Sequence, residues 1–278
     1  MSSSTPTITL YDIRFASPPE LNTCAPNPWK ARYALNFKSV PYTTKWISML
    51  EIKATRLSLN LPPVRKFVDG TDFYTLPCIT DSSTSSGIGD SFDIAAYLQR
   101  VYPDSGAGDL FPEQKLDYVC PEIMGLAVPL SERTDDLYPE YARFNTNVDW
   151  AFTMHTQLAG HGMKWDKEVE GEIQREFVRR AGRASWDELG AKGEMRVALM
   201  ASLERTLEAL ARMLERDGRG PFILGDRPSY ADCIVGGWLR MFNMTVEKEE
   251  WRAISGWYGG VFGSLHEALQ ERFGKVKV

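Results

Sequence analysis

The chain has 278 residues, 43% of them hydrophobic and 25% charged, which is globular composition for one large domain or two of ordinary size. A net charge of -5 without any Lys/Arg-rich block argues against a nucleic-acid partner. No run of about 18 apolar residues is present, which argues against a membrane span. The polar start MSSSTPTITL is unlike a secretory signal.

The first hundred residues alternate between strand-like and helix-like segments. The predicted order is β-α-β-α-β-β-α, with strands at 8–13, 41–48, 74–80 and 86–90 and helices from Pro28, at 51–61 and at 92–101. The first two strands are far enough apart for a parallel crossover. The last two flank the turn DSSTSS, which suits an antiparallel hairpin. We expect a small domain with a mixed sheet.

The rest of the chain reads differently. The Gly/Pro/Asp-rich stretch Tyr102 to Pro112 is the best linker candidate, and no period-2 pattern follows it. Leucines at 203, 207, 210 and 214 recur on one helical face. Ser229 and Asp232 stand three apart ahead of an apolar helix, which predicts a capping box with Asp in place of Glu. The second region is predicted to be all helical.

The opening helix raises the question of thiol chemistry. Asn27-Pro28 is typical of an N-cap followed by proline at the first helical position, so the positive end of the helix would face Cys24. A thiolate is stabilised at such an end, whether it belongs to the protein or to a ligand. The alternative is a structural Cys24, because a lone cysteine without a nearby histidine is more often a small buried hydrophobe.

Two further elements could bind a ligand. A cis bond at Leu76-Pro77 would expose the main chain of Leu76 as a strand edge, whereas a trans proline would only begin a strand. Asp90 and Ser91 follow a short strand at a helix start, where free amides favour a carboxylate and Asp90 could pair with an amine. Together they could hold an α-amino acid terminus; simple helix capping is the alternative.

Other chemistries find no support in the sequence. Gly87 and Gly89 lack the third glycine and the acidic ribose ligand of a dinucleotide loop. His155 and His161 are not at a metal-pair spacing, His266 is distant, and no metal is expected. The four cysteines (Cys24, Cys78, Cys120 and Cys233) form neither a disulfide framework nor a zinc motif, which favours a reducing, cytoplasmic location.

Together, these elements resemble the cytosolic glutathione transferases over nearly the whole chain. The resemblance implies a thioredoxin-like domain over 1–103, a linker over 104–112 and an all-helical domain over 113–278. It implies that TLP is the family's cis-proline element, with Leu76 and Pro77 at the cysteinyl part of glutathione. It also implies that Asp90 and Ser91 of GDS hold the γ-glutamyl end, and that GDRPSYADCIV is a capping element.

The segments NPWKARYALNFKSVPY and YTLP are most similar to the fungal transferases related to bacterial lignin β-etherases. In that subgroup a serine precedes the Pro-Asn pair, and here the position is Ala25. Three outcomes stay open. Cys24 acts as a mixed-disulfide nucleophile, Asn27 or a backbone amide replaces the hydroxyl, or the protein only binds. Cys24 and Asn27 are therefore the candidate catalytic residues.

The resemblance implies a transferase that uses the glutathione thiolate on hydrophobic, aromatic electrophiles, by conjugation or ether-type cleavage. The alternatives are thiol-disulfide exchange through Cys24 and a noncatalytic carrier of aromatic metabolites. Glutathione as co-substrate and a homodimer are implied by the family. We expect the hydrophobic pocket between the domains, with Phe111 to Leu137 as its helical wall. The charged block Lys164 to Lys192 is interpreted as a solvated helical insertion without an assigned function.

Overall fold

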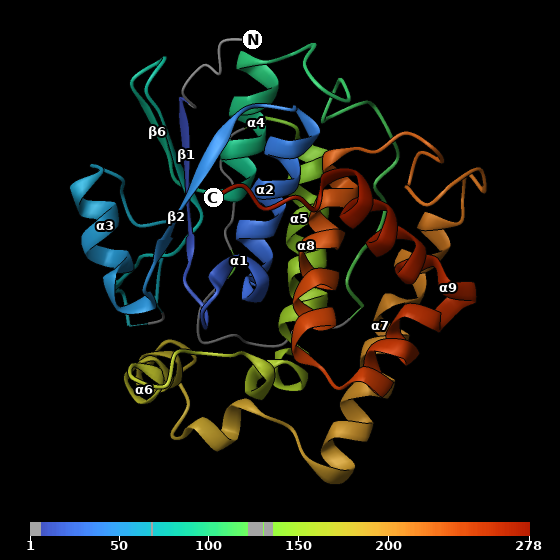
Figure 1. The fold of residues 1–278 in the computed structure, drawn as a ribbon. Helices are drawn as coiled ribbons and strands as arrows, with labels where there is room; N and C mark the ends of the chain where they lie inside the picture. Colours follow the sequence, from blue (N-terminus) through green and yellow to red (C-terminus); the bar gives the residue numbers. More distant parts are fainter. Residues whose placement is uncertain (1–6, 68, 122–129, 131–135) are drawn as a thin grey trace.

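The computed structural model describes residues 7–67, 69–121, 130 and 136–278. An α/β region comes first and a mostly helical region follows, with helices of the second region packed along one side of the first (Figure 1). This succession of fold classes confirms the prediction. The domain bounds 1–103, 104–112 and 113–278 stay a prediction.

The sheet has four strands in the order β2-β1-β5-β6. These are β1 Ile8–Ile13, β2 Tyr42–Ile47, β5 Cys78–Asp81 and β6 Ser86–Ile88. β1 and β2 are parallel, whereas β1–β5 and β5–β6 are antiparallel. Both the parallel crossover and the hairpin are therefore confirmed. A second small hairpin, β3 Arg65–Lys66 with β4 Asp72–Phe73, was not predicted.

Helices cover both faces of this sheet. They are α1 Pro19–Asn22, α2 Pro26–Phe37, the 3₁₀ turn η1 Met49–Glu51, α3 Ile52–Ser58 and α4 Ser91–Val101. In Figure 1, α2 and α4 lie on one side of the sheet and α3 on the other. α2 is almost entirely buried because it packs on α4 and also on helix α8 of the helical region.

The helical region contains five longer helices and three 3₁₀ turns among the described residues. They are α5 Pro139–Thr153, η2 Thr156–Leu158, η3 Gly160–Gly162, α6 Glu170–Arg180, η4 Trp186–Leu189, α7 Gly193–Leu214, α8 Tyr230–Thr245 and α9 Lys248–Phe273. The capping box of α8 is confirmed, with the Ser229 N–H donating to Asp232 Oδ2 at 2.7 Å. No helix in the described part of the chain is long and apolar enough to span a membrane.

The predicted helical wall over Phe111 to Leu137 is wrong where it can be checked. Residues 111–121 contain no helix, and 122–129 and 131–135 lie outside the described residues. Tyr118 and Cys120 in this stretch are buried, and the Tyr118 hydroxyl donates to the Thr206 carbonyl at 3.0 Å. Burial of an extended segment against α7 produces apolar residues without helical periodicity, which the composition alone could not distinguish from a helix.

Two glycines let α8 approach its neighbouring helices closely. A Cβ on Gly237 would lie 2.6 Å from the Pro26 carbonyl oxygen of α2, and one on Gly236 would lie 2.2 Å from Leu269 Cδ1 of α9. Lys30 of α2 also donates a hydrogen bond to Asn145 Oδ1 of α5 at 2.9 Å, and forms an ion pair with Asp149 of the same helix. The start of α2 is therefore held against the helical region.

Candidate functional site

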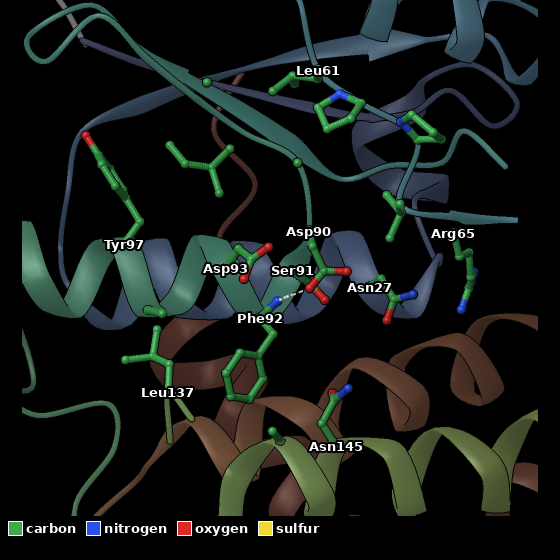
Figure 2. Close-up of a pocket in the computed structure, with 18 of the residues that line it drawn as sticks. Asn27, Leu61, Arg65, Asp90, Ser91, Phe92, Asp93, Tyr97, Leu137 and Asn145 are labelled. Carbon is green, nitrogen blue, oxygen red and sulfur yellow. Dashed lines mark hydrogen bonds between the residues drawn. The ribbon is translucent and has the colours of Figure 1, made fainter. Parts of the chain in front are cut away.

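Three adjoining cavities surround the start of α2, and the two larger ones have walls from both the sheet region and the helical region. The largest, about 880 Å³, contains Asp90 and Ser91 in its wall (Figure 2). A second cavity of about 260 Å³ is mostly apolar, and a small one of about 10 Å³ has the cis-proline segment in its wall. Asn27 lines all three, so the cavities meet at the start of α2.

Helix α2 begins two residues earlier than predicted. Pro26, not Pro28, is the first helical residue, and Ala25, not Asn27, is the N-cap. Both prolines fit the first turn, because amides there have no intrahelical acceptor. With Pro26 and Pro28 both lacking an N–H, the first turn can offer only the amides of Ala25 and Asn27. Ala25 makes no side-chain cap hydrogen bond.

Cys24 lines the apolar cavity but is only 2% exposed. Burial raises the pKa of its thiol to about 12, and Arg240 nearby offsets only part of that effect. The thiol is therefore protonated at neutral pH, which favours the structural interpretation of Cys24. Asn27 has a different position, in the first turn of α2 at the junction of the cavities (Figure 2).

The Leu76–Pro77 bond is cis, so of the two alternatives left open the structure has the cis form. Leu76 and Pro77 line the small cavity together with Asp90. Sequence reasoning missed the residue that fixes this segment, Arg56 of α3. Its guanidinium donates to the carbonyls of Thr75 at 3.0 Å and Gly89 at 2.7 Å, and to that of Pro62.

Arg56 also explains the glycine before Asp90. A Cβ on Gly89 would lie 2.3 Å from Arg56 Nη2, so a larger residue would push the guanidinium away. The segments on both sides of the small cavity thus depend on one buried arginine. No sequence signal identified Arg56, because a single arginine in a short amphipathic helix is normally a surface residue.

Asp90 and Ser91 lie at the start of α4, at the wall of the largest cavity (Figure 2). Asp90 is the N-cap, and its Oδ1 accepts the Phe92 N–H at 2.8 Å. The predicted capping role is therefore confirmed. It engages one carboxylate oxygen with the helix, while the residue still lines the cavity. Ser91 is 4% exposed and occupies the first helical position.

Arg65 is a second residue of the site that the sequence analysis did not identify. It lines the large and small cavities, and its buried Nε has no hydrogen-bond partner among the described residues. Burial lowers the pKa of its guanidinium, while the carboxylates of Asp149 and Asp90 oppose that effect. Figure 2 shows Arg65 and Asn145 at different edges of the same cavity. The cavity therefore combines cationic, anionic and amide groups.

The apolar cavity has walls from both regions of the protein. Phe15, Met49 and Phe73 come from the α/β region, and Met163 and Phe177 from the helical region. Thr75 and Leu76 line this cavity and the small one, so the two spaces adjoin at the cis-proline segment.

The charged block Lys164 to Lys192 is partly helical, with many exposed charged residues as predicted, but it also packs on the α/β region, which was not predicted. The Ala16 N–H donates to the Lys164 carbonyl at 2.9 Å, and the Phe15 and Trp165 rings stack at 4.6 Å between centroids. Arg14 pairs with Asp166 at 3.0 Å. These contacts hold the segment on the α/β region, where its α6 helix closes one side of the apolar cavity. Long-range pairs of this kind have no signature in local periodicity.

The hydrogen bonds of two histidines give them structural roles. His155 hydrogen-bonds the Ala151 carbonyl and Ser202, and His161 the Trp186 carbonyl at 2.9 Å. Within the described ranges no group of His, Cys, Asp and Glu could hold a metal ion.

Comparison with known proteins places both regions in one family. The glutathione S-transferase N-terminal domain model matches residues 25–101, and the C-terminal domain model matches 174–272. The glutathione S-transferase-like protein ustS of Aspergillus flavus is 29% identical, with 94% of this chain and 89% of that protein covered.

Solved structures of fungal glutathione transferases have the same architecture. The crystal structure of glutathione S-transferase CsGST63524 of Ceriporiopsis subvermispora, in complex with glutathione, has TM-score 0.72 and 26% identity over 96% of this chain and 97% of that one. Glutathione transferase GSTFuA2 from Phanerochaete chrysosporium has TM-score 0.75 and 26% identity over 97% and 99%. The similarity therefore extends over both the sheet region and the helical region.

Proposed function

The chain belongs to the glutathione transferase superfamily, and we propose that it binds glutathione across the three adjoining cavities and directs the thiol into the apolar one. The observation that carries the proposal is the continuity of the cavities: Asn27 lines all three, Asp90 lines the large and small ones, and Leu76 the small and apolar ones. A tripeptide with a charged end and a thiol needs such a path from polar to apolar surroundings.

The polar end of glutathione fits the start of α4. The γ-glutamyl amine would pair with the Asp90 carboxylate, and the α-carboxylate would meet Ser91 and the positive end of the helix. Arg65 would supply a cation to the glycyl carboxylate, since its Nε is buried without a partner in the described structure. The cysteinyl main chain would pair with Leu76, next to the cis bond.

The reacting thiol would then lie at the start of α2. Ala25 has no hydroxyl, so the donors left there are the side chain of Asn27 and the amides of Ala25 and Asn27. We propose that these replace the missing serine. The thiolate sulfur would attack an electrophilic carbon of an aromatic compound in the apolar cavity, forming the S–C bond as the leaving group departs with the bonding electrons, by conjugation or ether cleavage.

The two alternatives differ in how the structure bears on them. Thiol-disulfide exchange through Cys24 is disfavoured because burial raises the pKa of that thiol to about 12. A noncatalytic carrier of aromatic metabolites is favoured by one observation, the missing hydroxyl at Ala25. A homodimer in the cytoplasm, without a metal, belongs to the same proposal.

Titration calorimetry with glutathione tests the proposal. The wild type should bind one glutathione per chain, and Asp90→Asn should weaken binding by about 10-fold or more, since a hydrogen bond to a charged group contributes about 1.5 to 3 kcal/mol. Asp104→Asn removes the same charge from an exposed position in the predicted linker and should change nothing. No heat with the wild type would refute the proposal. Glutathione binding without turnover of any aryl halide or aryl ether would favour the carrier.

A further inference from the structure

The apolar cavity contains a single charged side chain among its described lining residues, Arg180 of α6. Its side chain is 15% exposed, and its guanidinium donates to the Tyr74 carbonyl at 2.9 Å and to Glu176 Oε1 at 2.8 Å. These bonds use Nε and Nη1. Within the described residues Nη2 makes no hydrogen bond.

The carboxylate beside Arg180 is shared. Glu176 Oε2 accepts from Arg179 Nε and Oε1 from Arg179 Nη2, both at 2.8 Å, so this one carboxylate serves two guanidiniums. Arg179 also has Asp69 nearby and is 57% exposed, and therefore solvated. Among the described residues, Glu176 is the acidic group that faces Arg180, and burial lowers the pKa of this guanidinium despite it.

The rest of the cavity is suited to a flat, apolar molecule. Phe73, Phe177 and three methionines (Met49, Met163 and Met241) line it, and the Arg180 guanidinium lies 5.3 Å from the Phe73 ring centroid. The volume of about 260 Å³ is slightly smaller than the range of about 300 to 1,000 Å³ that is usual for ligand pockets. One or two aromatic rings would occupy this space.

We propose that the apolar cavity binds a small aromatic anion, such as an aryl carboxylate, with its acidic group at Arg180 and its rings between Phe177 and the methionines. As the substrate class of the transferase, this inference rests on the proposed function. Arg180 and Phe177 of this site belong to the segment Lys164 to Lys192 (the α6 segment), to which the sequence analysis assigned no function. A charged hydrogen bond in an apolar cavity discriminates strongly between an anion and its neutral isostere.

The test compares 2-naphthoate with 2-naphthamide, its neutral counterpart of the same shape, by equilibrium binding without glutathione. The wild type should bind the naphthoate about 10-fold to 100-fold more tightly. Arg180→Met should abolish that preference while leaving naphthamide affinity within about 2-fold, because a charge is lost and the apolar stem is kept. Arg180→Lys should retain part of the preference. Arg179→Met is the matched control. Arg179 pairs with the same Glu176 carboxylate but does not line the cavity, so this variant should leave the preference intact.

The naphthoate-to-naphthamide ratio separates recognition from folding, because a general loss of structure weakens both ligands together. Equal weakening of both ligands in Arg180→Met, or no change in either, overturns the inference. Glutathione affinity of the same variants is measured in parallel and should stay at the wild-type value. If the wild type binds no glutathione while the naphthoate preference depends on Arg180, the proposed function fails and the anion site stands.

Discussion

Restoring a hydroxyl at the start of α2 should increase thiolate chemistry. Ala25→Ser places a hydroxyl at the N-cap, where it can accept the Asn27 N–H, the one amide within reach because Pro28 at the next position has none. Its proton stays free to donate to a thiolate bound in the apolar cavity that Ala25 lines. One added group therefore supplies both a helix cap and a thiolate donor.

The magnitudes follow from these two bonds. A hydrogen bond to a charged group contributes about 1.5 to 3 kcal/mol, which lowers the pKa of bound glutathione by about 1 to 2 units. Turnover of an aryl halide at neutral pH should rise by up to the same factor, about 10-fold to 100-fold. The cap should add about 0.5 to 2 kcal/mol to the free energy of unfolding.

The assay is the ultraviolet absorbance of the bound thiolate as a function of pH, with kcat measured alongside. Ala25→Val, which adds bulk without a hydroxyl, is the control and should show neither effect. If Ala25→Ser still binds glutathione but leaves the thiol pKa and kcat unchanged, the thiol does not lie at the start of α2, and the proposed orientation is refuted.

Three other predictions concern packing, pH and the cysteine. Gly237→Ala should destabilise the protein by about 1 to 3 kcal/mol and weaken glutathione binding, because its Cβ would lie 2.6 Å from a main-chain oxygen of α2. The control Gly256→Ala, whose Cβ would have nothing within 4 Å, should have neither effect. Thermal unfolding measures the stability and calorimetry the glutathione binding. Burial lowers the pKa of His266 from 6.5 to about 4, so its contribution to stability is lost as pH falls from about 6.5 to 4. His266→Gln should therefore change the free energy of unfolding relative to wild type by about 3 kcal/mol across that window in urea titrations, and a constant difference would contradict the burial argument. Cys24→Ser should leave glutathione-dependent turnover within about 3-fold, and loss of thiol transfer in that variant would restore Cys24 as the nucleophile.

Local signals in the sequence predicted local structure well. The capping box at Ser229 and Asp232 lies within three residues, and the parallel β1–β2 pair and the β5–β6 hairpin follow from the lengths of their connections. Asp90 was likewise identified because the strand, the acidic residue and the helix start are consecutive. In each case the physical determinants are neighbours in the chain, so a single sequence contains them.

The misplaced start of α2 shows where local rules become ambiguous. Asn27-Pro28 is the better capping pair by side chain, but Ala25-Pro26 fits the first helical position equally well. The close packing of Gly237 against the Pro26 carbonyl involves a residue more than 200 positions away along the chain. Tertiary contact of that kind cannot be inferred from one helix start.

The same reasoning explains Arg56 and the α6 segment. Arg56 fixes the cis-proline segment because three loops direct carbonyl oxygens at its guanidinium. The α6 segment is held in place because Lys164 and Asp166 contact residues that follow the first strand. Neither set of contacts leaves a pattern in composition or period. Contacts between residues so far apart in the sequence can be identified only in the folded structure.

A crystal structure of the protein with glutathione tests the central claim most directly. We predict the γ-glutamyl amine at the Asp90 carboxylate, and the sulfur within hydrogen-bond distance of Asn27 and facing the apolar cavity. Cys24 should stay a free thiol, as it is in this structure. A glutathione sulfur bonded to Cys24, or a glutathione that leaves the Asp90 carboxylate without its amine, would contradict the account.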